Sequence, residues 1–407
     1  MADVTFGWSE QHLMVRQALR QFMEKELKPI VWDLEDGKVL PYEFARKLAN
    51  TFGLAELVRG MWARRKEKKA AGDREAAAGE IAAFRDPAMS ALLVIEMCRY
   101  SPGAALAFGA SLGLCGQTIL SKGTDDQIER FAIPVLTAEK VGCWGLTEPE
   151  AGSDAFSMRT TARLDGDYYI LNGSKTLITN APYADTFVVY ARMKSPTPDN
   201  AAREAIHAFI LERGMPGLST GQPFKKMGMH ASPTGEIFLS DVRVPRANLL
   251  GGKEKDPSRD QAVGVLMGER TAMPSMCLGI VERLLDECVR YSKERKQFGR
   301  PIAEFQLVQQ KIANLFVTRE IIEMYVHKMI WMQQNGIKSM KEASAAKLYC
   351  GRATVEAGLD AVQVFGGAGY IRDAGVEMMV RDAKLFTIGG GTDEIQIGWI
   401  ARELLKD

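Results

Sequence analysis

Histidine and paired cysteine are scarce in this sequence. Its 4 histidines are scattered, and its 6 cysteines lie far apart with no C-x-x-C pair among them. Because the usual spacings of a zinc site are missing, we predict no metal site. We interpret the cysteines as reduced thiols of a reducing compartment, which indicates the cytoplasm. In a eukaryote, the mitochondrial matrix would fit equally after removal of a transit peptide.

The sequence also lacks a dominant charge and a long apolar run. Its 52 Lys and Arg residues nearly balance 51 Asp and Glu residues, which leaves a net charge of +1. This balance argues against recruitment to nucleic acid or to a membrane by whole-protein charge. The amino terminus has no signal-peptide pattern, and we find no uncharged apolar stretch of the roughly 18 residues that a membrane span requires. We expect neither a nucleic-acid nor a membrane partner.

Common nucleotide and hydrolase motifs are absent as well. The glycine clusters Gly366-Gly-Ala-Gly369 and Gly389-Gly-Gly391 lack the G-x-G-x-x-G spacing, and they sit in no βαβ pattern, which argues against a Rossmann site. The sequence has no G-x-x-x-x-G-K-[ST] loop and no G-x-S-x-G turn. These absences argue against a P-loop nucleotidase and a Ser-His-Asp hydrolase.

The order of helical and strand-like patterns predicts three domains in the 407 residues. Residues 1–140 are typical of helices, and Ser9 is placed to cap the first of them. Residues 141–252 contain several strand-like runs, and helical patterns return in residues 253–407. We therefore predict an α+β fold with an N-terminal helical domain, a central β domain and a C-terminal helical domain.

Two local patterns predict individual elements. The dipeptide Asn172-Gly173 stands between two strand-like runs, which predicts a β-hairpin turn there. The segment from Trp62 to Phe84 is rich in Ala, Arg, Lys and Glu, which predicts a helix that Gly72 and Gly79 interrupt.

The segment Thr147-Glu-Pro-Glu-Ala-Gly-Ser-Asp154 is the most informative for function. It gathers hydroxyl groups, a turn-forming proline and a glycine just before the β-rich region. Such a loop can present N–H and O–H donors to a polar ring or a phosphate. On its residues alone it could equally be an ordinary Asx or Ser/Thr turn.

This segment closely resembles the T-E-P-x-A-G-S-D signature of the acyl-CoA dehydrogenase family of flavoenzymes. Further matches follow in the family's order and span most of the chain: Asn172-Gly-Ser-Lys175, Ile178-Thr-Asn180, Met227-Gly-Met229, Asp241-Val-Arg-Val-Pro245, Glu294-Arg-Lys-Gln-Phe-Gly299, Gln363-Val-Phe-Gly-Gly367, Arg381-Asp-Ala-Lys384, Gly391-Thr392 and Glu394-Ile-Gln396. The resemblance implies an all-α N-terminal domain, a β-barrel-like central domain and a C-terminal four-helix bundle.

The resemblance also implies a bound FAD whose adenine end reaches a neighbouring subunit. Near the flavin, it implies contacts from Trp144, Leu146, Thr147, Gly152, Ser153 and Thr179. Around the pyrophosphate and adenosine part, it implies contacts from Arg295, Gln297, Phe298, Gln363, Gly366 and Gly367. It also implies that Thr392 and Glu394 bind the cofactor, without assigning them to one end of it. Arg295 would donate charge-assisted hydrogen bonds, although such an arginine could also form an ordinary surface ion pair.

The position of the catalytic base departs from the commonest family pattern. The family's usual glutamate precedes a Gly-Thr pair, but this chain has Gly390 at that position. A subset that includes isovaleryl-CoA dehydrogenase carries the glutamate 25 residues before the E-R-K motif, which corresponds to Glu269 here. An adjoining apolar stretch could bury Glu269 and raise its pKa, as a base requires. The alternative is an ordinary glutamate paired with a nearby cation.

The reaction implied by the resemblance is α,β-dehydrogenation of an acyl-CoA to the trans-2-enoyl-CoA. Glu269 would remove the α-proton, Ser153 and Arg270 would contact the substrate, and electrons would pass to an electron-transferring flavoprotein. A homotetramer is the family's usual assembly, and a dimer is the alternative. Two other functions remain open: a flavoprotein of the same fold acting as an enoyl-CoA reductase or an oxidase, and a non-catalytic subunit of a mixed oligomer.

Three departures from the family bear on this expectation. Leu177 stands where the family commonly has an aromatic residue against the flavin, and His230 stands where it often has arginine. We interpret His230 as a surface or hydrogen-bonded histidine. Residues 60–87 replace a glycine-rich loop with a charged segment, for which we favour a solvated helix. The alternative is a docking surface for anions, formed by Arg64, Arg65, Lys66, Lys68 and Lys69.

Overall fold

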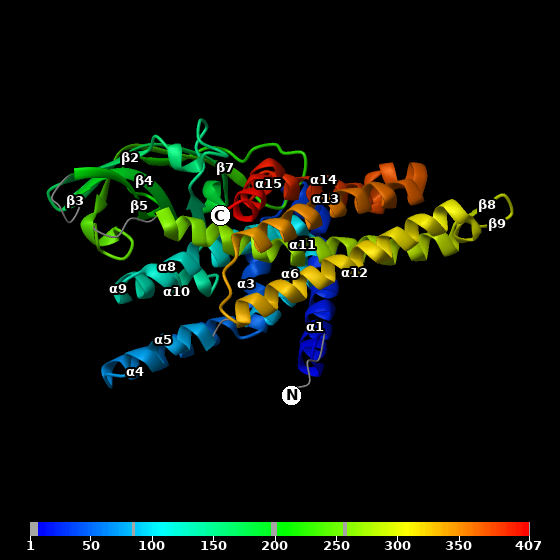
Figure 1. Cartoon of the computed structure of the whole chain (residues 1–407), viewed down its shortest axis with the longest axis horizontal. Helices are drawn as coiled ribbons and strands as arrows, with labels where there is room; N and C mark the ends of the chain where they lie inside the picture. Colours follow the sequence, from blue (N-terminus) through cyan, green and yellow to red (C-terminus); the bar gives the residue numbers. More distant parts are fainter. Residues whose placement is uncertain (1–6, 84–85, 197–201, 255–258, 407) are drawn as a thin grey trace.

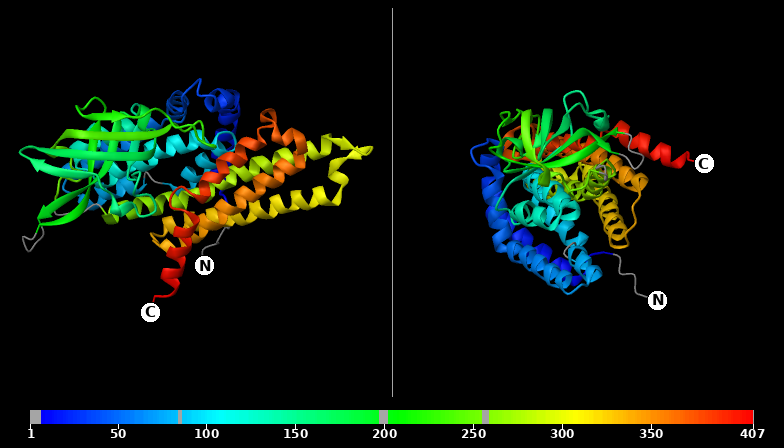
Figure 2. Two further views of the ribbon diagram at one scale, coloured as in Figure 1. Left: turned by 90° about the horizontal axis from the view of Figure 1, so that it is seen from above. Right: turned by 90° about the vertical axis from the view of Figure 1, so that its left-hand side faces the viewer.

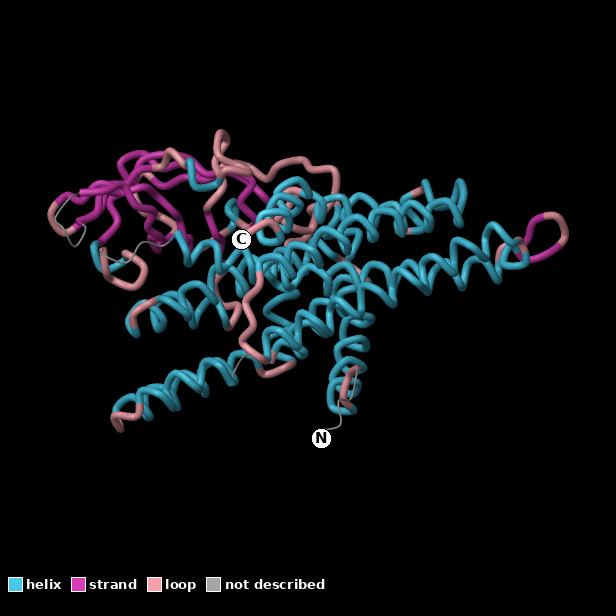
Figure 3. The backbone as a smooth tube through the Cα atoms, in the orientation of Figure 1, coloured by secondary structure: helices cyan, strands magenta, loops and turns pink. Residues whose placement is uncertain are grey.

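The computed structural model describes residues 7–83, 86–196, 202–254 and 259–406. Helices come first along the chain, a curled sheet follows, and long helices complete it (Figure 1). The sheet lies over helices toward one end of the molecule, and a separate two-stranded hairpin lies at the opposite end (Figure 3). This arrangement confirms the predicted fold class. The exact domain limits at residues 140 and 252 stay predictions.

The N-terminal region consists of helices joined by short π-helical turns. Ser9 accepts a hydrogen bond from the backbone of His12, which confirms the predicted cap of α1. The helices are α1 (Glu10–Phe22), α2 (Val31–Glu35), α3 (Pro41–Thr51), α4 (Leu54–Ala70), α5 (Arg74–Ala83), α6 (Pro87–Cys98), α7 (Pro102–Phe108), α8 (Gln117–Lys122), α9 (Asp125–Gln127) and α10 (Ile133–Leu136). The π-helical turns are Met23–Leu27, Gly109–Gly116 and Ile128–Ala132.

One continuous helical segment, Pro102–Lys122, is long and apolar enough to cross a membrane, by length and composition only. This finding corrects the statement that no uncharged apolar stretch is long enough. Within the protein, 61% of its most apolar window is buried. Buried side chains such as Ile119 and Leu120 belong to the same apolar cluster as Phe131. The segment therefore has the burial expected of a core helix.

The central region is a seven-stranded sheet with the order β1-β4-β2-β3-β7-β6 and with β5 paired to β4. Its strands are β1 (Gly142–Gly145), β2 (Thr161–Asp165), β3 (Tyr168–Thr179), β4 (Thr186–Pro196), β5 (Ala202–Glu212), β6 (Leu218–Thr220) and β7 (Thr234–Pro245). Residues such as Tyr169, Phe187 and Val242 bury one apolar core between the strands. The strand β1 pairs in parallel with β4, and the last paired residue of β1 is Gly145. The loop that contains Thr147 follows directly.

The predicted hairpin at Asn172-Gly173 is wrong, because both residues lie inside β3. The register with β7 shifts between Leu171 and Gly173, so the dipeptide forms an irregularity of the strand. Gly173 has φ +145°, and a Cβ there would lie 2.5 Å from Oγ1 of Thr160. Glycine is therefore required for close approach of Thr160 and not for a turn. The chain reverses instead at Gly166, between β2 and β3.

The C-terminal region is built on three long helices. These are α11 (Arg259–Glu294), α12 (Gln306–Gln334) and α13 (Met340–Phe365), with the shorter α14 (Val376–Ala383) and α15 (Asp393–Leu404). The hairpin of β8 (Lys296–Gln297) and β9 (Arg300–Pro301) caps the far end of α11 and α12. It lies at the opposite end of the molecule from the sheet (Figures 1 and 2). The helix α15 projects from the body in both views of Figure 2.

The charged segment folds as the helical hairpin of α4 and α5. Gly72, with φ +85°, lies between the two helices as predicted, but Gly79 lies within α5 and does not interrupt it. The five predicted docking cations all have carboxylate partners: Arg64 and Lys68 with Glu80, Arg65 and Lys69 with Asp125, and Lys66 with Glu129. These pairs favour the solvated helix over a free anion-docking surface.

Candidate active site

The carboxylate of Glu269 lies against Gly390, although 121 positions separate them in the sequence. A Cβ at Gly390 would lie 3.5 Å from both Cδ and Oε1 of Glu269. The carboxylate thus comes next to the place where a side chain at position 390 would begin. The structure brings these two residues together, and the catalytic role of Glu269 stays a prediction.

Gly390 and Gly391 form a tight backbone turn, with φ values of +66° and +94°. We call these two residues the glycine turn. Its first carbonyl accepts hydrogen bonds from Nε of Arg270 at 3.0 Å and Nε2 of Gln396 at 3.2 Å. Its second accepts from Nζ of Lys347 at 2.7 Å and Nε2 of Gln396 at 2.8 Å. Side chains from α11, α13 and α15 therefore hold the turn in place.

Burial and charge oppose each other at Glu269. Burial raises its pKa above the ordinary value, and the cations of Arg270 and Lys347 act against this increase. Burial in turn lowers the pKa of Lys347 to about 8, which Asp393 opposes. A carboxyl group with a raised pKa is a stronger base once ionised than an ordinary surface glutamate. A carboxyl group with a raised pKa is the kind of group that general-base catalysis requires.

The loop from Thr147 to Asp154 is shaped by a buried ion pair. The ammonium of Lys175 is fully buried and contacts Oε1 of Glu148 at 2.7 Å and the Leu146 carbonyl at 3.2 Å. Glu148 also accepts a hydrogen bond from the backbone N–H of Thr160 at 3.0 Å. Burial lowers the pKa of Lys175 to about 8, and Glu148 opposes this change. Charged groups buried in this way are costly unless paired, so the pair fixes the loop on β3.

The residues expected near the flavin lie where β1 and β3 end and on the loop that follows β1. Trp144 and Leu146 are buried at the end of β1, and Thr179 ends β3. The backbone N–H of Thr176 donates to the Thr147 carbonyl at 3.0 Å, which holds the loop beside β3. Gly152 and Ser153 are exposed at the tip of that loop. The structure therefore brings this first group together.

The residues expected at the other cofactor end also lie together, at the far end of the helices. Arg295, Gln297 and Phe298 follow α11, and Gln363, Gly366 and Gly367 lie at the end of α13. The stacked rings of Tyr291 and Phe365, 4.1 Å apart, join the two helix ends. Within one chain the ends of α11 and α13, which carry this second group, lie away from the sheet that carries the first (Figures 1 and 2).

Two exposed apolar side chains mark the two groups. Leu177 is 64% exposed and Phe298 is 92% exposed. Both have a positive φ, +56° for Leu177 and +51° for Phe298. This conformation is uncommon outside glycine and is often retained where a ligand or partner is bound. Both positions therefore fit contact with a planar apolar group.

The remaining predicted residues lie near the glycine turn. Thr392 precedes the first residue of α15, and Glu394 is exposed in the first turn of that helix. Arg270 is only 4% exposed, and its guanidinium also contacts Sδ of Met340 at 2.7 Å. These contacts support a role for Arg270 in holding the turn. Substrate binding by Arg270 and by Ser153 stays a prediction.

Sequence reasoning missed Lys347 and the bonding role of Gln396. Both side chains are fully buried. The available signal for Lys347 was a lone lysine inside the Ala- and Ser-rich run of residues 343–347. His230 is hydrogen-bonded as interpreted: its Nε2 lies 2.8 Å from the Lys226 carbonyl, and its Nδ1 lies 3.3 Å from Glu35.

All six cysteines are buried free thiols. Burial raises the pKa of Cys115 and Cys277 to about 12, so these two remain protonated at neutral pH. Across the described ranges, no group of three or more His, Cys, Asp or Glu residues is arranged to hold a metal ion.

Comparison with known proteins identifies relatives over nearly the whole chain. Residues 143–242 match the family description "Acyl-CoA dehydrogenase, middle domain", and residues 259–405 match "Acyl-CoA dehydrogenase, C-terminal domain". The chain is 35% identical to the 3-(aryl)acrylate reductase of Clostridium sporogenes over 399 residues, covering 98% of this chain and 100% of the relative.

Two further relatives extend this comparison. The caffeyl-CoA reductase-Etf complex subunit CarC of Acetobacterium woodii is 36% identical over 400 residues, covering 98% of this chain and 99% of the relative. The structure of butyryl-CoA dehydrogenase from Megasphaera elsdenii superimposes with a TM-score of 0.84 at 32% identity, covering 99% of this chain and 100% of that one.

Proposed function

This chain belongs to the acyl-CoA dehydrogenase family of FAD-dependent oxidoreductases, and we propose that it converts an acyl-CoA thioester to the trans-2-enoyl-CoA with Glu269 as the base. The observation that carries this proposal is the 3.5 Å approach of the Glu269 carboxylate to the empty side-chain position of Gly390. The commonest family base is missing at that position, which lies in a turn, and Glu269 brings a carboxylate to the same neighbourhood from α11.

Glu269 has the environment that the proton transfer requires. The thioester would lie with its α-carbon within hydrogen-bond reach of the carboxylate, which takes the α-proton as the carbon–hydrogen bond breaks. Arg270 donates to the Gly390 carbonyl, while the side-chain position of Gly390 faces the Glu269 carboxylate. Bound FAD supplies the acceptor, N5 of the flavin, for the hydride that leaves the β-carbon.

The two residue groups support a cofactor site shared between two copies of the chain. Glu269 and Glu294 lie on one helix, and their separation is about 37 Å at the helical rise of 1.5 Å per residue. This length exceeds the reach of one dinucleotide. Trp144, Thr147 and Thr179 would hold the flavin end in one copy. Arg295 and Phe298 of the second copy would hold the adenine end, so at least a dimer is required.

The electron acceptor we propose is an electron-transferring flavoprotein. The relative from Acetobacterium woodii is named as a subunit of a caffeyl-CoA reductase-Etf complex. Etf is the abbreviation of electron-transferring flavoprotein, so this name supports the proposed class of partner. Substrate bound over the flavin would exclude water, and it would keep the reaction of the reduced flavin with oxygen slow. The buried free thiols support a reducing compartment, and we propose the cytoplasm, or the mitochondrial matrix in a eukaryote.

A second candidate is reduction of an enoyl-CoA by the same site. The relatives named 3-(aryl)acrylate reductase and caffeyl-CoA reductase are 35% and 36% identical over nearly the whole chain. In this direction the protonated Glu269 returns the α-proton. Both directions use one base, so the equilibrium between acyl and enoyl thioesters and the available electron carrier decide which direction prevails.

The test is anaerobic flavin bleaching by a panel of short-chain, branched and aryl-propionyl CoA thioesters. The wild-type holoenzyme should bleach with at least one of them. Glu269→Gln should keep its yellow FAD and lose the reaction by about 10²- to 10⁴-fold, the usual contribution of a general base. Reoxidation of photoreduced enzyme by aryl-acryloyl CoA tests the reverse direction. Normal bleaching by Glu269→Gln would exclude Glu269 as the base.

A further inference from the structure

Lys347 is a buried cation beneath the glycine turn that the proposed reaction does not use. Its side chain is fully buried on α13, and Nζ donates to the Gly391 carbonyl at 2.7 Å. The nearest carboxylate, Asp393, is farther away at 3.8 Å and accepts a closer hydrogen bond from Arg352 at 2.8 Å. The shortest contact of the ammonium is therefore with the turn and not with a carboxylate.

The glycine turn lies within van der Waals contact of the Glu269 carboxylate. Positive φ values at both residues turn their carbonyls toward Arg270, Lys347 and Gln396, and the Gly390 hydrogen that replaces a side chain faces the carboxylate. If the Gly391 carbonyl lost its charged donor, the turn could relax and the space beside Glu269 would change. Displacements of about 1 Å at a reacting group can reduce rates by 10²-fold.

From these contacts, we propose that Lys347 is a positioning residue for Glu269: it fixes the glycine turn through the Gly391 carbonyl and sets a positive charge behind the carboxylate. This inference rests on the proposed role of Glu269. It assigns to Lys347 no contact with substrate or cofactor. Its effect is transmitted through the turn and through charge.

The groups that face Lys347 define the electrostatic part of this role. They are Asp393 on α15 and Glu269, Arg270 and Cys277 on α11. Arg270 and Lys347 both favour the ionised form of Glu269, whose pKa burial raises. Removing the ammonium removes one of two opposing cations, so the pKa of Glu269 should rise further. The ionised base would then appear only at higher pH.

The test compares Lys347→Met with Lys341→Met on the same helix, both as FAD-loaded enzyme. Hydrogen–deuterium exchange of the peptide covering residues 388–396, measured without substrate, should be faster in Lys347→Met by at least fivefold and unchanged in the control. In Lys347→Met, the acidic limb of the pH profile of the flavin-bleaching rate should shift to higher pH by about 1 pH unit. The decrease in kcat should be larger than any change in KM.

A second variant guards against a general folding defect. Lys347→Ala removes the atoms of propylamine, so added propylammonium should restore both the exchange protection and the pH limb, whereas an uncharged propanol should not. Glu269→Gln should keep the exchange protection of the wild type while losing the reaction, which separates failure of this inference from failure of the proposed function. Unchanged exchange and an unchanged limb in Lys347→Met would overturn the positioning role.

Discussion

At the scale of single residues, the pairing of Glu269 with Gly390 predicts that the base can be exchanged between helix α11 and the glycine turn. Glu269→Gly should lose flavin bleaching by about 10²-fold or more. Adding Gly390→Glu should restore at least tenfold of that loss, because a side chain at 390 begins 3.5 Å from the original carboxylate carbon. Restoration should be incomplete, since a left-handed φ costs a non-glycine residue about 1–2 kcal/mol. Stopped-flow bleaching measures both variants.

Gly390→Glu alone is the matched control for this exchange. It sets two carboxylates beside each other, so at least one of them should hold its proton to a higher pH. The bleaching rate of this variant should therefore rise with pH over a range above that of the wild type. A double variant no faster than Glu269→Gly, at any pH, would contradict equivalent placement of the two carboxylates.

Sequence reasoning proposed Glu269 as the base but did not single out Lys347, for a physical reason. The resemblance supplied a position for the base through the spacing of Glu269 and Glu294 along one helix. Lys347 acts through a carbonyl 44 positions away in the sequence, on another element. No local pattern encodes which buried lysine meets which turn. Such contacts appear only once the helices are packed.

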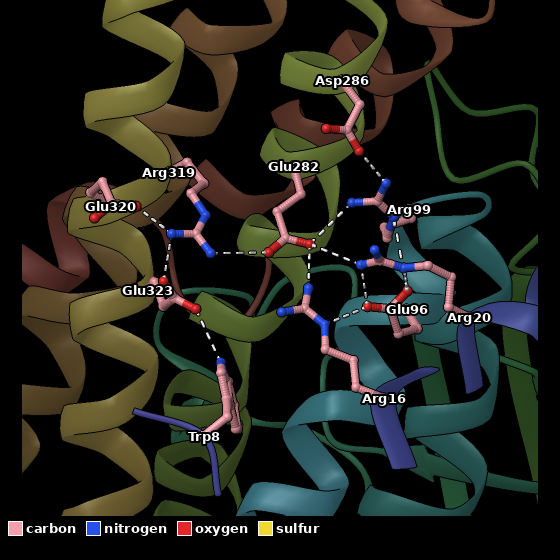
Figure 4. Close-up of polar contacts among 10 residues, drawn as sticks. All are labelled: Trp8, Arg16, Arg20, Glu96, Arg99, Glu282, Asp286, Arg319, Glu320 and Glu323. Carbon is pink, nitrogen blue, oxygen red and sulfur yellow. Dashed lines mark hydrogen bonds and ion pairs between the residues drawn. The ribbon is translucent and has the colours of Figure 1, made fainter. Parts of the chain in front are cut away.

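At the scale of elements, a network of buried ion pairs joins α1, α6, α11 and α12 (Figure 4). Glu96 is fully buried and accepts hydrogen bonds from Arg16 at 2.7 Å and Arg20 at 2.9 Å. Glu282 continues the network to Arg99 at 3.0 Å and also pairs with Arg16. Glu96→Gln would remove the buried carboxylate that Arg16 and Arg20 share, and both arginines would keep only their contacts with Glu282. We expect destabilisation of about 1.5–3 kcal/mol, the usual worth of hydrogen bonds to a charged group, measured by denaturant unfolding.

The pH dependence of this effect follows from the shift at Glu96. Burial alone would raise its pKa, but the hydrogen bonds and charges of Arg20 and Arg16 outweigh burial and lower it. A group whose pKa is lower in the folded state stabilises the protein at pH values above its unfolded-state pKa. This stabilisation is lost as the pH falls through the folded-state pKa. The difference in the free energy of unfolding between wild type and Glu96→Gln should therefore be largest at neutral pH and should decrease below about pH 4. Glu320→Gln, at a 49% exposed side chain of the same network, is the control, with an effect of at most about 1 kcal/mol.

We predict that the five cations of the α4–α5 hairpin do not steer an anionic substrate or partner to the enzyme. Each of its five cations already contacts Glu80, Asp125 or Glu129. Replacing all five by Gln should change the bleaching rate and its salt dependence by less than about twofold, since exposed pairs are worth about 0–1 kcal/mol each. Rates measured at low and moderate salt test this expectation. A steep loss of salt dependence in the variant would revive a docking role for the hairpin.

Element types were predictable because the apolar period differs between helices and strands. The change from helices to strands and back appears in the structure in the predicted order. The Asn172-Gly173 hairpin failed because the same dipeptide also suits an irregular strand beside Thr160. Gly79 failed as an interruption because a helix tolerates an isolated glycine at a cost of about 1 kcal/mol. Local sequence cannot distinguish these outcomes, which neighbouring strands and turns decide.

At the scale of the whole molecule, the exposed apolar surface favours assembly. Along α12, the side chains of Phe316, Val317, Met324 and Trp331 are each more than half exposed. Apolar patches of this kind on a helix usually meet another protein surface. At the end of the adjacent α11, Phe298 is almost fully exposed. These surfaces fit the homo-oligomer that the proposed shared FAD site would require. On that proposal, we predict that cofactor binding and assembly are linked.

That linkage leads to a prediction about mixed oligomers. Glu269→Gln and Arg295→Ala should each be inactive alone, the first for want of a base and the second for want of a charged contact to the cofactor. In a hybrid dimer, one site combines the intact Glu269 of one copy with the intact Arg295 of the other, and its partner site carries both defects. Co-expressed chains with two different tags, purified through both, should therefore regain about half of the wild-type bleaching per dimer. If the two residues served the same site within one chain, every hybrid site would carry a defect. The hybrid would then stay inactive, which would contradict the shared site.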